Sequence, residues 1–576
     1  MPRPLSLRSR RNDARLVNAR PLFAPSNGRR LLAILGGVML AVSFPKLSIA
    51  GLAWVAPGIF LAAALGTDGR TAFTIGFLGG LAHHLISLSW LLNIPVMKLA
   101  PITGWIALST YCALYQALWV WLCWRVFPGS FSNPAAVNAP ALGGLLDRFL
   151  APGWFARAGW TFTCAALWVA GEMVQVRFLS GFPWNFLGTS QFKMLPVIQV
   201  ASATGVYGVS FLVAWFAVAL LCAFVVVLRQ SQSPRRCLGE LILPFAAIFA
   251  VVALGFPRLT QSPVPKKHLT AALIQPSIPQ RMIWSPEENA KRFEQLLELS
   301  NRALTNRSVR GERATLLVWP EAAVPGYVRF DTNLHHAITN LIARHGVWMI
   351  LGADDAAPRR DSDDPFAHDN FNASFLLSPD GEFRASYRKR RLVMFGEYLP
   401  FARWLPFLER WTGMGSFTPG DGPVPFRAID PAFKTSVLIC FEDTFPHAVR
   451  DDVGDDTDFL LNLTNNGWFG ESAAQWQHAA NAVFRAVENG LPLVRCANNG
   501  LTCVVSARGH VSHTFFPGTI DAYGPGFKIV EVPLLDGARH EATTYRRHGD
   551  VFGWACVVWS ALAVGFALRR RETKLE

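Results

Sequence analysis

The hydrophobic positions of this chain form long runs in its first half and alternate with polar positions in its second half. Between residues 31 and 257 only four carboxylates interrupt the apolar pattern: Asp68, Asp147, Glu172 and Glu240. A helix that spans a membrane needs about 20 predominantly apolar residues. The pattern therefore predicts about eight spans, at residues 31–46, 49–66, 71–94, 103–127, 159–179, 206–228, 240–256 and 551–569.

The arginines indicate how these spans are oriented. Outside the polar region 258–550, most of the arginines lie in the N-terminal arm, the 125–158 loop, the segment after residue 228 and the C-terminal tail, which all fall on one side of the predicted membrane. Basic residues concentrate on the cytoplasmic side. We therefore expect a basic cytoplasmic arm (1–30), a membrane domain with about seven spans (31–257), an external polar domain (258–550), a last span (551–569) and a cytoplasmic tail (570–576).

The polar region 258–550 alternates between two periodicities. Nine short apolar and β-branched runs predict strands at 269–275, 315–320, 347–353, 371–378, 435–441, 458–464, 491–497, 501–506 and 527–532. Helical patterns occupy about 286–307, 331–345 and 472–489. Strands that alternate with helices are typical of a layered α/β domain.

Composition narrows the possible classes of protein. A hydrophobic content of 51%, with 42 Phe and 20 Trp, is too apolar for an ordinary soluble protein of 576 residues. The formal charge of +14 could indicate nucleic-acid binding, but the arginines flank hydrophobic runs and fit better as topology signals, so no nucleic-acid partner is expected. The nine cysteines show no CxxC or Cys/His ligand spacing. We therefore predict no disulfide framework, no metal and no cofactor.

Three stretches carry residues suited to acyl-transfer chemistry. Cys440 ends a predicted strand in TSVLICFEDTF, Glu321 ends another in LLVWPEAAVP, and Lys389 follows a third in YRKRR. A reactive thiol needs a base, and an acyl-transfer intermediate needs a cation or donors near its oxyanion. Because catalytic groups gather at strand ends in a parallel-type sheet, we expect the three to meet in one cleft. The lysine is also expected to favour the thiolate form of the cysteine.

Each of these residues also has an ordinary explanation. Cys440 could be a buried core thiol, since free cysteine is among the most buried residue types. Glu321 could be a cap at the end of its strand, and Lys389 lies in a basic run that is usually a solvated face. The three together favour an active site over these separate explanations.

The segment 397–420, EYLPFARWLPFLERWTGMGSFTPG, combines many aromatics with prolines and glycines. One interpretation is a helix packed on the core, and the other is a mobile lid that touches lipid. The terminal glycines could act as hinges, and the apolar residues are too many for a loop in water, so we favour the lid.

The motifs resemble a known superfamily. WPEAAVP, YRKRRLVMFGEYLPF and LICFEDTF are similar to the Glu–Lys–Cys signature of the nitrilase, or carbon–nitrogen hydrolase, superfamily. The eight spans, SGFPWNFLG and IPQRMIW narrow the resemblance to its membrane-embedded branch, the apolipoprotein N-acyltransferases. This resemblance covers about residues 31–569. It implies a multi-span α-helical membrane domain joined to a nitrilase-like four-layer αββα sandwich.

The resemblance also implies roles for individual residues. Glu321 would be the general base and Cys440 the nucleophile, while Lys389 and the backbone N–H of Phe441 would stabilise the oxyanion. Supporting acids that orient Lys389 and the cleft would be Glu397 and Glu442. Phe441 and Trp284 would line the entrance for substrate.

The implied reaction moves an acyl chain from the sn-1 position of a phospholipid such as phosphatidylethanolamine, through a thioester on Cys440, to the α-amine of a diacylated apolipoprotein. We expect a monomer in the bacterial inner membrane, with the catalytic domain on the periplasmic face. Two alternatives remain open. One is a membrane-tethered amidase or nitrilase that acts on small amides, and the other is a non-catalytic scaffold or transporter.

Overall fold

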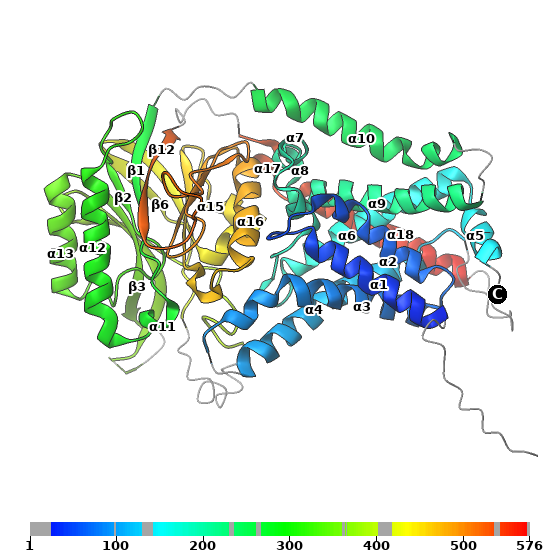
Figure 1. Cartoon of the computed structure of the whole chain (residues 1–576), viewed down its shortest axis with the longest axis horizontal. Coiled ribbons are helices and arrows are strands. Elements are labelled where there is room, and N and C mark those ends of the chain that lie inside the picture. The colour runs from blue at the N-terminus through cyan, green and yellow to red at the C-terminus, as the bar shows by residue number, and fades with distance from the viewer. Residues whose placement is uncertain are drawn as a thin grey trace, which may run out of the picture.

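The computed structural model divides into a helical part and an α/β part, which lie end to end along the long axis (Figure 1). It describes residues 25–96, 99–129, 142–229, 235–260, 267–359, 363–364, 366–400, 417–534 and 542–572. The segment interpreted as a lid falls mostly on residues 401–416, which lie outside the described residues.

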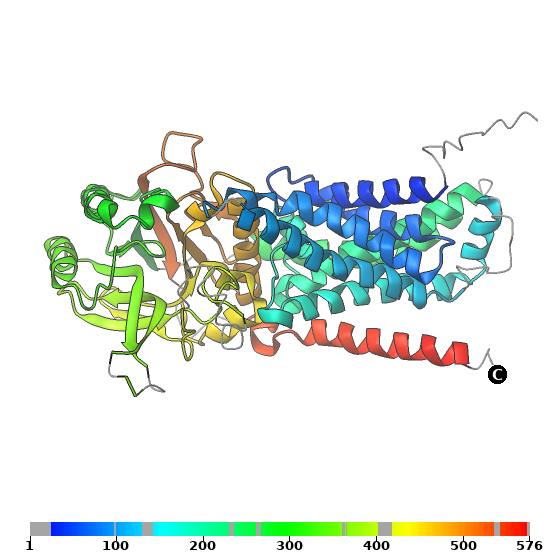
Figure 2. The ribbon, with the colours of Figure 1, turned by 90° about the horizontal axis from the view of Figure 1, so that it is seen from below.

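The helical part, also called the membrane part or helical bundle, consists of the N-terminal helices and the last helix of the chain. These are α1 (Pro25–Val42), α2 (Ala56–Ala64), α3 (Gly69–Ser87), α4 (Leu99–Arg125), α5 (Leu142–Leu150), α6 (Trp154–Gln175), α7 (Leu195–Ile198), α8 (Ala201–Thr204), α9 (Val206–Arg229), α10 (Arg235–Thr260) and α18 (Val551–Glu572). Four short 3-10 turns join them: η1 (Ala50–Trp54), η2 (Ser89–Asn93), η3 (Phe178–Ser180) and η4 (Leu187–Gln191). Figure 2 shows α18 running from the α/β part along the helical part to its far end.

A helix lies on each of the eight predicted spans. Within the described residues, however, only some of these helices are long and apolar enough to cross a membrane. Four helical stretches are long and apolar enough: Leu99–Arg125, Val206–Arg229, Cys237–Thr260 and Val551–Arg570. The chain therefore has a helical region with four candidate spans.

Two six-stranded sheets form the centre of the α/β part. Their orders are β12-β1-β2-β3-β4-β5 and β11-β10-β9-β8-β7-β6. The strands are β1 (Lys267–Gln275), β2 (Leu316–Val318), β3 (Trp348–Pro358), β4 (His368–Leu377), β5 (Phe383–Arg388), β6 (Pro425–Ile429), β7 (Ala432–Ile439), β8 (Phe459–Thr464), β9 (Leu493–Ala497), β10 (Cys503–Val505), β11 (Val511–Ser512) and β12 (Gly526–Leu534). All nine predicted strands are present, and β5, β6 and β11 are additional.

Helices cover the outer face of each sheet, which gives four layers (Figure 1). The first sheet is covered by α12 (Asn289–Thr305) and α13 (Thr332–His345), and the second by α15 (Pro446–Asp452) and α16 (Ala474–Asn489). Short helices complete the α/β part: α11 (Gln280–Ile283), η5 (Pro286–Glu288), η6 (Cys440–Thr444), η7 (Asn466–Phe469) and α17 (Thr544–His548). The predicted αββα sandwich is therefore the observed architecture of this part.

Local sequence signals explain where these helices begin and end. The Asp331 side chain accepts hydrogen bonds from the backbone N–H groups of Asn333 and Leu334 and so caps the start of α13. That helix ends at Gly346, whose φ of 64° lies in the left-handed region that suits glycine. The helix predicted over 331–345 is therefore confirmed, with its start displaced by the capping residue.

Three apolar cores hold the layers together. One lies between the two sheets, and a second lies between the first sheet and its helices. The third is shared, because residues of α16 and of the second sheet pack in one cluster with the helices of the membrane part. The second sheet is thus joined to the membrane part through a continuous core.

Helix α16 is the element that joins the two parts. All of its residues except Trp476 are buried, although its polar face carries Gln477, Asn481 and Glu488. The Gln477 carboxamide accepts from the Trp90 and Trp184 indoles at 3.1 and 2.8 Å. It also donates to the carbonyl oxygens of Pro45 and Ser87 at 2.9 and 3.0 Å. A polar helix face is therefore buried here because the membrane part supplies its hydrogen-bond partners.

Candidate active site

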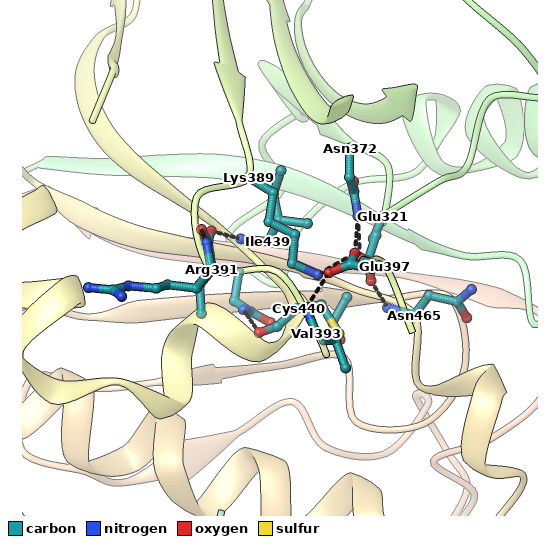
Figure 3. A network of polar contacts seen from close by, with 12 residues as sticks. Glu321, Asn372, Lys389, Arg391, Val393, Glu397, Ile439, Cys440 and Asn465 are labelled. Atoms are coloured by element: carbon teal, nitrogen blue, oxygen red, sulfur yellow. Dashed lines mark hydrogen bonds and ion pairs between the residues drawn. The ribbon is translucent and has the colours of Figure 1, made fainter. Parts of the chain in front are cut away.

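The three residues predicted for acyl transfer converge, but from two sheets and not from one. Glu321 follows β2 and Lys389 follows β5, both in the first sheet, while Cys440 follows β7 in the second. Both sheets contain antiparallel as well as parallel pairs, so the argument from strand ends in a parallel-type sheet applies only in part, although the three residues do meet. The site forms because the ends of β2, β5 and β7 meet where the two sheets face each other. Figure 3 shows Lys389, Glu321 and Glu397 gathered beside Cys440.

Cys440 sits on a sharp turn between a strand and a helical turn. It is the first residue of η6 and has a φ of +51°, a conformation that side chains other than glycine rarely adopt. Its carbonyl oxygen is held by the Asn462 amide at 3.0 Å and lies 3.1 Å from Nε2 of His478. These contacts fix the backbone of the turn, so the direction of the thiol is set by the fold.

Lys389 is fully enclosed and lies between two carboxylates. Its Nζ atom lies 2.7 Å from Oε1 of Glu397 and 3.5 Å from Oε1 of Glu321. Burial lowers the pKa of Lys389, but the neighbouring carboxylates outweigh burial and the pKa is raised overall. The side chain therefore remains an ammonium ion in an enclosed site.

Glu321 is buried and held at both carboxylate oxygens. Oε1 accepts from the Asn372 amide at 2.8 Å, and Oε2 accepts from the backbone N–H of Asn465 at 2.8 Å. Asn372 also donates to Glu397 at 3.0 Å and so bridges the two acids (Figure 3). The motifs did not identify Asn372 or Asn465, because each lies in or just after an ordinary strand sequence.

The thiol of Cys440 is protonated near neutral pH, although Lys389 favours the thiolate as expected. Burial and then the charge of Glu321 raise the pKa of Cys440 to about 12, and Lys389 opposes them only in part. The cysteine thus needs a base that takes its proton as it attacks. Glu321 is the carboxylate whose charge acts most strongly on the pKa of this thiol.

The other predicted residues occupy distinct places. Glu442 does not contact Lys389 by a hydrogen bond; it accepts from the Tyr387 hydroxyl at 2.9 Å and from the backbone N–H groups of Ile439 and Arg390 at 2.8 Å. It therefore links the end of β5 to the end of β7. Burial raises the pKa of Glu442, and the backbone donors oppose this rise.

The aromatic residues predicted to line the entrance lie on different sides of the site. Phe441 is buried, and its ring centroid lies 6.0 Å from that of Phe182 and 6.1 Å from that of Trp184, both in the loop after α6. Trp284 is 46% exposed and packs edge-on against Trp468, with ring centroids 5.1 Å apart. The turn that carries Cys440 thus packs on the loop after α6 in the helical part.

Among the described residues, no cluster of three or more His, Cys, Asp or Glu side chains could hold a metal ion. The charged groups of the site are instead paired with one another. This arrangement suits nucleophilic chemistry at a thiol with a carboxylate base and a fixed cation.

Comparisons with known proteins agree with this division of the chain. The profile of the apolipoprotein N-acyltransferase N-terminal domain matches residues 36–219, and that of the carbon-nitrogen hydrolases matches residues 270–518. A solved amidase from Nesterenkonia sp. is 19% identical, covers 47% of this chain and 92% of its own, and has a TM-score of 0.33.

Similar proteins extend over nearly the whole chain. The apolipoprotein N-acyltransferase of Geobacter metallireducens is 34% identical over 549 residues, which cover 94% of this chain and 96% of that protein. The apolipoprotein N-acyltransferase of Vibrio cholerae is 27% identical and covers 94% of this chain and 97% of its own. The chain therefore belongs to the apolipoprotein N-acyltransferase family.

Proposed function

We propose that this protein transfers an acyl chain from the sn-1 position of a phospholipid to the α-amine of the diacylglyceryl-cysteine of an apolipoprotein. The convergence of Glu321, Lys389 and Cys440 next to the membrane part carries this proposal. The names of the similar proteins support the same activity. Phosphatidylethanolamine is the proposed donor, and the acting unit is a monomer.

The acylation half of the reaction follows from the protonated thiol. Glu321 takes the thiol proton as the Cys440 sulfur attacks the ester carbonyl, and the negative charge on the carbonyl oxygen is stabilised by Lys389 and the backbone N–H of Phe441. The intermediate then expels the lysophospholipid alkoxide, which Glu321 protonates. The product is a thioester on Cys440, and no proton is gained or lost overall.

The second half of the reaction forms the amide. The free α-amine of the acceptor attacks the thioester carbonyl, and Cys440 leaves as a thiol. The thioester lies above the ester in free energy, but the amide lies below both, so the overall transfer from ester to amide runs downhill and requires no ATP. Water has to be kept from the thioester, and the aromatic packing of Phe441 on Phe182 and Trp184 supports a dry environment on the membrane side of the turn.

We further propose the membrane arrangement given by the arginines. The chain spans the bacterial inner membrane about eight times, its basic arm and tail are cytoplasmic, and residues 258–550 form the catalytic domain on the periplasmic face. Both substrates are anchored in the same bilayer, so a site at the junction of the two parts places Cys440 within reach of lipid. Fusing a topology reporter at residue 545 or 575 tests this arrangement, with activity outside the cytoplasm expected for the first and inside for the second.

The covalent intermediate is the direct test of the activity. The full-length protein is incubated with phosphatidylethanolamine and no acceptor, and the intact mass is measured. One acyl chain, labile to hydroxylamine, is expected on Cys440, and Cys440→Ala is expected to abolish it. Cys496→Ala is the matched control, because that thiol is buried in the core between the sheets.

The acceptor completes the test. A diacylated lipopeptide with a free α-amine is expected to discharge the adduct into an amide, and its N-acetylated form is not. A wild-type protein that acquires no acyl group from any phospholipid would favour the non-catalytic scaffold. Hydrolysis of small amides without acylation by phospholipid would favour the amidase.

A further inference from the structure

The proposed reaction produces a proton that the site has to dispose of. At neutral pH an α-amine with a pKa near 8 is mostly an ammonium ion. Of its three N–H protons, one stays on the amide nitrogen and one returns to the Cys440 thiol as the thioester C–S bond breaks. The third has no acceptor in the products. Each turnover on an ammonium acceptor therefore releases one proton, whereas the acylation half releases none.

Asp354, which the sequence motifs did not identify, lies in β3, next to the strand that carries Asn372. It belongs to β3 and is the cross-strand partner of Asn372 in β4, the amide that bridges Glu321 and Glu397. Directly opposed residues of an antiparallel pair project from the same face of the sheet. The Asp354 carboxyl group therefore projects on the same face as the amide that holds both catalytic-site acids.

The packing of β3 gives a second, independent measure of proximity. Two residues before Asp354, on the same face of the strand, a Cβ added at Gly352 would lie 2.8 Å from the Cα of Glu321. The Gly352 carbonyl also accepts the N–H of Ala323 at 3.0 Å. Strand β3 thus packs against the turn that carries Glu321. Asp354 lies two residues further along β3, on the same face of the strand as Gly352.

Asp354 differs from its acidic neighbours in exposure and in partners. Glu321 and Lys389 are 7% and 1% exposed, whereas Asp354 is only partly buried. Within the described part of the chain, no ion pair includes Asp354. The buried Arg292 guanidinium of α12, which faces it, donates instead to Asn289 Oδ1 at 3.0 and 3.2 Å. Its carboxylate is therefore free to change protonation and has access to solvent.

The charges around Asp354 suit a group that exchanges protons near neutral pH. Burial and then the nearby Glu321 raise the pKa of Asp354 to about 6, with Arg292 opposing and Glu397 adding to the rise. Tyr327 is a further neighbour of Asp354, because burial and then the charge of Asp354 raise the pKa of Tyr327. Lys389 supplies the remaining charge of the cluster, paired with Glu397 and Glu321.

We infer that Asp354 is the proton outlet of the aminolysis half-reaction: it receives the excess proton that Glu321 collects from the acceptor ammonium and releases that proton to solvent. Asp354 acts through Glu321 and does not touch the acyl group. This inference rests on the proposed function. It predicts a requirement for Asp354 in one half-reaction only.

The test measures the two half-reactions separately in the full-length protein. Acylation is followed as thioester formed from phosphatidylethanolamine, and aminolysis is followed as thioester lost on mixing with a diacylated lipopeptide. Asp354→Asn is expected to leave acylation within about twofold of wild type and to slow aminolysis at pH 6.5 by about tenfold to hundredfold, at the lower end of the range for general acid–base catalysis. Asp354→Glu is expected to restore most of the aminolysis rate. Asp369→Asn, which removes a partly exposed carboxylate of neighbouring strand β4 that pairs with Arg359, is the control and is expected to change neither step.

The pH profile separates this role from a structural one. In the wild type, the aminolysis rate is expected to show an inflection near pH 6, because protonated Asp354 cannot accept a further proton. Asp354→Asn is expected to lose this inflection. Equal slowing of both half-reactions, or no slowing of either, would overturn the inference while leaving the proposed function intact. Absence of acylation in the wild type would overturn both.

Discussion

The two sheets of the catalytic part contribute different kinds of group to one site. The first sheet, covered by α12 and α13, provides the charged groups Glu321, Lys389 and Glu397. The second sheet provides Cys440, and its covering helix α16 is packed into the membrane part. Proton handling is thus placed on the side away from the helical bundle, and the nucleophile on the side fixed to it. The comparison suggests that changes in the first sheet will affect chemistry, whereas changes behind the second will affect how the nucleophile is presented.

The largest effect is expected from removing the base in the first sheet. Glu321→Gln keeps the shape of the side chain but cannot take the thiol proton. Acylation of Cys440 by phospholipid, measured as the single-turnover rate of mass increase, is expected to fall about 10²–10⁴-fold. Glu382→Gln, at an exposed carboxylate just before β5, should leave the rate unchanged. If Glu321→Gln acylates at the wild-type rate, the base is not Glu321 of the first sheet.

The next largest effect is expected at Lys389. Lys389→Met removes the cation that faces the oxyanion and leaves Glu321 and Glu397 without their shared partner. Acylation is expected to slow by about 10²–10³-fold, the scale for loss of one oxyanion donor. The thermal midpoint should also fall, because two buried carboxylates lose their compensating charge. A loss below tenfold would show that the cation serves stability and not the transition state.

A smaller effect is expected behind the second sheet. Gln477→Leu leaves two indole N–H groups and two carbonyl oxygens of the membrane part without their partner, and each buried unpaired group costs about 1–3 kcal/mol. We expect a lower thermal midpoint and an acylation rate reduced by about tenfold through a slightly displaced nucleophile turn. Asn93→Ala removes a more exposed bond across the same junction, to the Phe469 carbonyl, and is the matched control. If the Gln477→Leu protein is destabilised but acylates at the wild-type rate, the packing of α16 on the helical part does not influence catalysis.

The smallest effect, of opposite sign, tests how the two sheets influence each other. The charge of Glu321 helps to raise the pKa of Cys440, so Glu321→Gln should lower this pKa. Because one pKa unit changes the thiolate fraction tenfold, alkylation of Cys440 by iodoacetamide at pH 8 is expected to be about three- to tenfold faster than in the wild type. The same substitution would thus speed alkylation and slow acyl transfer. Slower alkylation would mean that Glu321 does not act on the thiol through its charge.

Much of this arrangement could be predicted from the sequence, because each strand carries its own apolar pattern. The nine predicted strands are present, and so are the helices predicted at 286–307, 331–345 and 472–489. Strand β5 was missed because FRASYR has few apolar residues, and β6 and β11 were missed because PFRAI alternates over only five residues and VS spans two. Sequence periodicity also does not indicate which strands pair, so the two-sheet origin of the site was not predicted.

The site was predictable to the extent that its residues lie in distinctive motifs. Glu321, Lys389 and Cys440 each interrupt or follow an apolar run and could be recognised. Asn372 and Asp354 lie within strands, where only pairing between β3 and β4 reveals that they face the same acids. Only the folded geometry shows that burial and the charge of Glu321 outweigh Lys389 and raise the pKa of Cys440.

The pairing of β1 with β12 has a consequence for how the protein is made. These strands form one antiparallel ladder in which Lys267 lies opposite Leu534, so the first and last strands of the catalytic part are neighbours. The first sheet cannot be completed until nearly the entire region has been synthesised, and pairing over such a sequence separation is slow. During that interval the other strands of the first sheet await β12, their last partner. Chaperones that shield unpaired strand edges at the membrane surface would therefore be expected to influence the yield of this protein more than they influence its finished activity.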